Sequence, residues 1–126
     1  MQNRTPRPKI EHRIKNMFKV DIKDIGGKVI KDTDVYLLKD NAFGKNLVLS
    51  STFLRANQST TGHNHEGQEE VYFFVDGKGE MEIDDNRFPV KAGDVICIED
   101  GEFHKVHNTG HLGLYFVCVF DGKRNH

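Results

Sequence analysis

Two histidines and a glutamate lie close together in the middle of the chain, within residues 57–77. His63 and His65 are two residues apart, and in an extended chain such residues project from the same face. Glu70 begins a run of β-branched and aromatic residues, 71–75, that predicts a strand. Two imidazoles and a carboxylate brought together by a hairpin form a three-point site for a divalent metal ion. The same pattern also occurs in solvated surface loops, so this stretch alone leaves both interpretations open.

A second stretch, residues 93–108, places His104 after a glycine turn at the start of another predicted strand. The two stretches resemble, in order and at full spacing, the two motifs of the cupin family. The first motif, G-x5-H-x-H-x3or4-E-x6-G, has Asn57 at its first glycine and is otherwise filled by His63, His65, Glu70 and Gly77. The second motif, G-x5-P-x-G-x2-H-x3-N, has Glu99 at its proline and is otherwise filled by Gly93, Gly101, His104 and Asn108. Asparagine adopts a positive φ more readily than most residues, so we expect Asn57 to make the turn of the missing glycine.

The resemblance implies one divalent metal ion per chain, held inside a barrel by His63, His65, Glu70 and His104. Nitrogen and oxygen ligands without a thiolate suit iron, manganese, nickel, cobalt or zinc, and the sequence does not choose among these metals. Three neutral imidazoles and one carboxylate leave a divalent ion with a net charge of about +1. Such a centre favours a small anionic or enolisable oxygen ligand as its partner.

The alternation of side chains along a strand separates the expected ligands from their neighbours. Spacing alone allows Glu69 or Glu70 as a ligand, and the six residues that separate Glu70 from the next motif glycine favour Glu70. If Glu70 points inward, Tyr72 points inward too, so Tyr72 is a candidate catalytic residue. The alternative is that the Tyr72 side chain only fills the interior of the barrel. When His104 points inward, His107 is expected to point outward.

The rest of the chain is a series of short strands separated by turns, with no convincing amphipathic helix. Besides a strand that carries the first two histidines, the expected strands are residues 17–23, 29–30, 35–38, 47–55, 70–75, 80–83, 88–90, 95–98, 103–107 and 114–120. Strands at spacings of about 8–12 residues are typical of an all-β sandwich or barrel. The resemblance sharpens this to a jelly-roll barrel, also called a double-stranded β-helix, over residues 17–120. A basic polar arm, 1–16, precedes the barrel and a polar tail, 121–126, follows it.

Length and charge exclude several classes of protein. The 126 residues suffice for one domain with its own core, and a net charge of −1 gives no sign of a nucleic-acid partner. No apolar run approaches the roughly 20 residues that cross a bilayer, and no signal-peptide core is present, so we expect no membrane partner and a cytoplasmic location. Cys97 and Cys118 lie in apolar runs and are predicted to be buried, reduced thiols.

Two of the expected strands, residues 71–75 and 114–120, are apolar on both faces. One face of each strand can fill the barrel, and the other needs cover from a further layer. We therefore expect a homodimer, with the N-terminal arm reaching the partner subunit.

Three classes of function fit this pattern. The first is an enzyme that uses the metal as a Lewis acid, such as a sugar-phosphate isomerase or epimerase, because small single-domain cupins of this kind are similar to mannose-6-phosphate isomerase. Tyr72 and Arg55 would then be pocket residues for proton handling or anion binding. The second class is an iron- or manganese-dependent dioxygenase or decarboxylase. The third is a non-catalytic module in which the metal holds a ligand or the fold, so the sequence leaves open whether the protein is an enzyme.

Overall fold

The computed structural model describes residues 19–42 and 44–122, which contain nine β-strands and no helix. The strands are β1 (Lys28–Asp32), β2 (Tyr36–Asn41), β3 (Leu47–Leu54), β4 (Glu70–Asp76), β5 (Lys78–Ile83), β6 (Asn86–Lys91), β7 (Val95–Ile98), β8 (His104–His107) and β9 (Leu114–Asp121). All paired strands are antiparallel. The all-β class expected from short strands and turns is confirmed. This part of the chain contains no helix that is able to cross a membrane.

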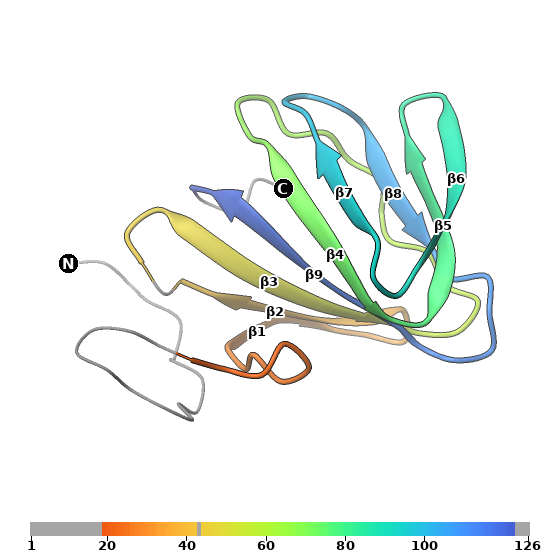
Figure 1. Ribbon diagram of the computed structural model, residues 1–126, viewed down its shortest axis with the longest axis horizontal. Helices are drawn as coiled ribbons and strands as arrows, with labels where there is room; N and C mark the ends of the chain where they lie inside the picture. Colours follow the sequence, from red (N-terminus) through yellow and green to blue (C-terminus); the bar gives the residue numbers. More distant parts are fainter. Residues whose placement is uncertain (1–18, 43, 123–126) are drawn as a thin grey trace.

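The strands form two sheets (Figure 1). The larger has the order β1-β2-β3-β9-β4-β7, and the smaller has the order β6-β5-β8. The chain passes from one sheet to the other between β4 and β5, again between β6 and β7, and twice more around β8. These repeated crossings produce the expected double-stranded β-helix. The first crossing is made at Gly77, where φ is 91° and a Cβ would lie 2.7 Å from the carbonyl oxygen of Gly113.

The core lies between the two sheets. Leu54, Phe74 and Phe116 of the larger sheet pack with Met81 and Val106 of the smaller one, and each is at most 3% exposed. Successive side chains of a strand point to opposite faces, so every second side chain of β4 and β9 points into the core between the sheets. Burial of each such side chain stabilises the fold by roughly 1.5–3 kcal/mol, so the core fixes the strands from which the site residues project.

The prediction of a strand at residues 17–23 is wrong for residues 19–23, the part that the structure describes. Asp21 and Asp24 form only an isolated bridge, in which the Asp24 N–H donates to the Asp21 carbonyl oxygen at 3.0 Å. The Lys23 N–H donates to Oδ1 of Asp21 at 2.8 Å. Aspartate side chains close turns in this way, and the apolar alternation of this stretch does not reveal it. The arm at residues 1–16 and residues 123–126 of the tail lie outside the described residues.

The segment that carries His63 and His65 is a loop rather than the expected strand. It comprises residues 55–69 and contains two isolated bridges, Ser59 with His107 and His63 with His104. At its start Asn57 has a φ of 59°, which confirms the expected turn at the motif position of a glycine.

Candidate metal centre

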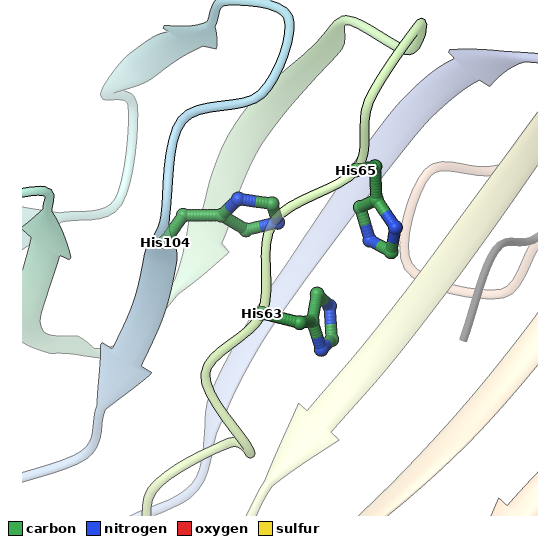
Figure 2. Close-up of side chains that lie close together, drawn as sticks. All are labelled: His63, His65 and His104. Carbon is green, nitrogen blue, oxygen red and sulfur yellow. The ribbon is translucent and has the colours of Figure 1, made fainter.

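Three histidines from two distant parts of the chain converge inside the barrel (Figure 2). His63 and His65 come from the loop before β4, and His104 is the first residue of β8. One nitrogen of each imidazole belongs to a group of atoms that all lie within 4.8 Å of one another. His65 and His104 are buried and His63 is half-buried. The structure thus brings together the three histidines that the sequence predicted as ligands.

Backbone hydrogen bonds hold the loop along β8 and set this geometry. The His63 N–H donates to the carbonyl oxygen of His104 at 3.2 Å, and the His104 N–H donates to that of His63 at 3.0 Å. Farther along, the Gly101 N–H donates to the carbonyl oxygen of His65 at 3.0 Å. The loop therefore extends the smaller sheet beyond β8, which places His63 opposite His104 and leaves His65 two residues on.

Glu70 adjoins this group through His104. It is the first residue of β4, is 6% exposed, and has Oε2 2.8 Å from Nε2 of His104. Burial raises the pKa of Glu70, but the hydrogen bond to His104 and the charges of the three histidines lower it more, so its pKa lies below the usual value. Burial lowers the pKa of His104, but the Glu70 carboxylate and the Glu102 carbonyl raise it more, so its pKa lies above the usual value.

The tautomer of His104 decides what can lie between these two groups. Nδ1 of His104 is 3.0 Å from the carbonyl oxygen of Glu102, which can only accept, so Nδ1 carries a proton. A neutral imidazole then presents the lone pair of Nε2 to the carboxylate oxygen. Both atoms are fully buried, and apart from each other they have no hydrogen-bond partner among the described residues. Two facing lone pairs at 2.8 Å require a cation, either a proton on the imidazole or a metal ion bound to both.

His107 points away from this centre, as the parity of β8 predicts. Its Nε2 donates to Oε1 of Glu82 at 2.7 Å, and its Nδ1 lies 2.7 Å from Oγ of Ser59. Because Nε2 holds the proton, a neutral His107 accepts the Ser59 hydroxyl proton at Nδ1. His107 thus fastens the start of the loop to the outer side of the smaller sheet.

Tyr72 and Arg55 occupy different surroundings. Tyr72 is 8% exposed, stacks on Phe116 with ring centroids 5.4 Å apart, and has its ring 5.9 Å from that of His104. Arg55 instead lies near Asp32, with Nη2 3.5 Å from Oδ1, and its Nε donates to the carbonyl oxygen of Thr33 at 3.1 Å. Tyr72 therefore lines the interior beside the histidines, whereas Arg55 is not among the residues that line it.

A cavity of about 50 Å³ opens beside His63 and His104. Besides the residues discussed above, its lining includes side chains that the motifs did not indicate: Tyr36, Leu38, Ser50, Thr52, Thr60, Thr61 and Cys118. Cys118 is buried as expected, but Cys97 is exposed because it faces outward from β7. The parity of the strands could have found the cavity residues, but only after the pairing of β3 with β9 was known.

The profile of the Cupin domain matches residues 53–120, which is more than half of the chain. The chain belongs to the cupin family. This cupin is 33% identical over 94 residues to the oxalate-binding protein of Thermotoga maritima, and the alignment covers 75% of this chain and 78% of that protein. It is also 32% identical over 93 residues to an uncharacterized protein of Methanocaldococcus jannaschii, covering 73% and 71% of the two chains.

Solved structures share the fold of this cupin. A Thermotoga maritima protein described as a predicted oxalate decarboxylase superposes with a TM-score of 0.64 and 28% identity, over 70% of this chain and 81% of that one. KdgF from Halomonas sp. superposes with a TM-score of 0.68 and 16% identity, over 77% and 89% of the chains. An RmlC-like cupin from Shewanella frigidimarina superposes with a TM-score of 0.67 and 15% identity, over 78% and 86%. The last two similarities concern the fold alone.

Proposed function

We propose that this cupin binds one divalent metal ion through His63, His65, Glu70 and His104, and that the bound metal holds a small carboxylate such as oxalate. The observation that carries the proposal is the buried pair of His104 Nε2 and Glu70 Oε2, 2.8 Å apart, beside two further imidazoles. A divalent ion would satisfy these donors together, whereas four polar side chains without an ion would incur a desolvation cost of several kcal/mol.

The choice of oxalate rests on similarity and on charge. The relative with 33% identity is an oxalate-binding protein, and the similar structure with 28% identity is described as a predicted oxalate decarboxylase. When bound, the metal would supply a positive charge and open coordination positions for two carboxylate oxygens. The metal can be iron, manganese, nickel, cobalt or zinc, since the imidazole and carboxylate ligands suit all five.

The cavity argues against the sugar-phosphate isomerase and epimerase that the resemblance to mannose-6-phosphate isomerase suggested. The volume of the cavity is about 50 Å³. Sites for drug-sized ligands usually have volumes of roughly 300 Å³ or more. None of the described residues that line the cavity is a lysine or an arginine, the side chains that usually bind a phosphate. A sugar phosphate would therefore find neither the space nor the charge that it needs.

Decarboxylation of oxalate is the second candidate, and the position of Tyr72 favours it. Cleavage of the carbon–carbon bond of oxalate releases carbon dioxide and leaves an electron pair on the other carbon, which must take up a proton to give formate. The Tyr72 side chain lines the cavity beside His104 and offers a hydroxyl as the proton donor. Tyr72→Phe should then lose carbon dioxide release and keep oxalate binding. Activity that survives in this variant would exclude Tyr72 as the donor.

The homodimer remains part of the proposal. The outer face of the larger sheet carries apolar side chains of three adjacent strands, including Phe73 on β4, Val119 on β9 and Val95 on β7. Val95 is 55% exposed and Phe53 on β3 is 40% exposed. A second copy packed on this face would remove these side chains from water.

The experiment uses protein purified without an affinity tag. It compares the protein as purified, the metal-free protein after treatment with a chelator, and the protein reloaded with metal. Elemental analysis identifies the metal, and calorimetry measures oxalate binding. We expect about one metal ion per chain, and oxalate binding only to the loaded protein. Equal oxalate binding by the metal-free and loaded forms would contradict the proposal. Carbon dioxide release, measured on the same samples, separates the decarboxylase from a binding protein.

A further inference from the structure

A serine, a histidine and a glutamate form a chain of hydrogen bonds on the outer face of the smaller sheet. Oγ of Ser59 lies 2.7 Å from Nδ1 of His107, and Nε2 of His107 lies 2.7 Å from Oε1 of Glu82. Ser59 comes from the loop before β4, His107 from the end of β8 and Glu82 from β5. The metal centre does not include these side chains, because His104 points to the opposite face of β8 from His107.

The two partners of His107 fix the position of its proton. A carboxylate can only accept hydrogen bonds, so Nε2 carries the proton and the lone pair of Nδ1 faces the Ser59 hydroxyl. A hydroxyl that donates to an imidazole, with the other ring nitrogen held by a carboxylate, is the arrangement that activates a nucleophilic serine. In serine proteases the serine bonds Nε2 and the acid bonds Nδ1. Here the two nitrogens are exchanged, and each group keeps its function because either nitrogen can act as the base.

The Glu82 carboxylate keeps its negative charge beside the imidazole. The hydrogen bond from His107 is the main cause that lowers the pKa of Glu82, and the charges of Arg87 and Lys105 also lower it. Burial acts in the opposite direction and does not outweigh them. A charged carboxylate at this distance can stabilise the imidazolium that forms when His107 takes up a proton.

The backbone around Ser59 leaves a donor next to its hydroxyl. Ser59 forms an isolated antiparallel bridge with His107. The bonds on either side of the bridge are donated by the Thr60 N–H, at 2.9 Å, and by the Asn108 N–H, at 2.8 Å. The N–H of Ser59 therefore points away from β8, and it has no hydrogen-bond partner among the described residues. In serine proteases the N–H of the nucleophilic serine is one of the donors that bind the oxyanion.

The surroundings leave the serine accessible and shield the base. Ser59 is half-buried, and the His107 side chain is 12% exposed. A substrate can thus reach the hydroxyl while most of the imidazole is kept from water. The outer face of a sheet encloses only a short acyl group, which limits the substrate to small esters.

We infer that Ser59, His107 and Glu82 form a second site, separate from the metal centre, that hydrolyses small esters with a good leaving group. Oγ of Ser59 forms a bond to the carbonyl carbon of the ester while Nδ1 of His107 takes the hydroxyl proton. The bond from this carbon to the leaving oxygen breaks, and the leaving alcohol takes up the proton from Nδ1. Water, activated by the same nitrogen, then cleaves the acyl-serine and releases the acid. Ser59 and His107 are the catalytic residues, and Glu82 positions His107.

A fluorophosphonate probe and nitrophenyl acetate test the site on the full chain. The probe forms a stable bond only with an activated serine, and mass spectrometry of the labelled protein should place it on Ser59. Hydrolysis of nitrophenyl acetate should fall to the uncatalysed rate in Ser59→Ala, and by at least about a hundredfold in His107→Gln, the usual contribution of a general base. Both reactions should proceed equally before and after treatment with a chelator.

The two glutamates of β5 provide a matched pair of variants. Glu80 lies two residues from Glu82 on the same face of the strand, but its Oε1 accepts from Nε of Arg87 at 2.6 Å. Glu82→Gln should lower kcat by at least about tenfold with little change in KM, because it removes the charge that stabilises the imidazolium. Glu80→Gln should keep both constants within about twofold. Circular dichroism should show the same fold for both variants.

Three results would overturn this inference. The first is the absence of the probe from Ser59 in the unmodified protein, which does not depend on the folding of any variant. The second is an unchanged rate of hydrolysis in a folded Ser59→Ala variant. The third is loss of hydrolysis on chelation, which would assign the activity to the metal centre.

Discussion

Replacement of Asn108 by alanine should destabilise the fold strongly, because this side chain joins three segments around the site. Asn108 follows β8 and is 2% exposed. Its Nδ2 donates to the carbonyl oxygens of Leu54 at 3.0 Å, Arg55 at 3.2 Å and Leu112 at 2.8 Å. Its Oδ1 accepts from the Gly110 N–H at 3.0 Å. The amide therefore fastens the end of β3 and the loop before β9 to the end of the strand that carries His104.

The expected magnitude follows from this count of bonds. Nδ2 has two protons, so its contacts with three carbonyl oxygens count as about two hydrogen bonds, one of them shared. The bond that Oδ1 accepts brings the total to about three. Each buried bond contributes about 1 kcal/mol, so Asn108→Ala should reduce the free energy of unfolding by about 3 kcal/mol. In a domain of this size the melting temperature should fall by about 10 °C.

Urea denaturation followed by circular dichroism measures the effect. Asn46→Ala is the control, because Asn46 is exposed and accepts the Gly122 N–H through its backbone, which the substitution keeps. The control should change the free energy of unfolding by less than about 0.5 kcal/mol. Asn108→Asp keeps the acceptor but turns a carboxylate toward three carbonyl oxygens, so it should be at least as unstable as the alanine variant. A loss below about 1 kcal/mol in Asn108→Ala would refute the reasoning.

Three further predictions address the site, the core and the assembly. His63→Ala and His104→Ala should lose most of the bound metal in elemental analysis, whereas His107→Ala should keep it, and equal loss in all three would contradict the assignment of ligands. Met81→Ala should reduce the free energy of unfolding by roughly 2–5 kcal/mol in urea, since Met81 is 0% exposed. Phe73→Lys on the outer face should convert a dimer to a folded monomer in light scattering, and an unchanged mass would place the interface elsewhere.

The sequence by itself determined the class of fold and the residues of the candidate site. Short apolar runs with turn residues between them indicate strands wherever they occur, because a period of two and a turn are local properties. The spacing of His63, His65, Glu70 and His104 identified the polar side chains that now lie together. The outward direction of His107 followed from the same local alternation.

Only the tertiary structure decided how these residues meet and what surrounds them. The loop before β4 adopts no regular strand, and its course along β8 depends on hydrogen bonds between residues about 40 apart in sequence, such as those of His63 with His104. Ser50 and Thr52 belong to no motif, and they line the cavity because β3 pairs with β9 and turns them inward. Local patterns fix which face of a strand is apolar, but the partner across the barrel is set by non-local pairing, which no short stretch of sequence contains.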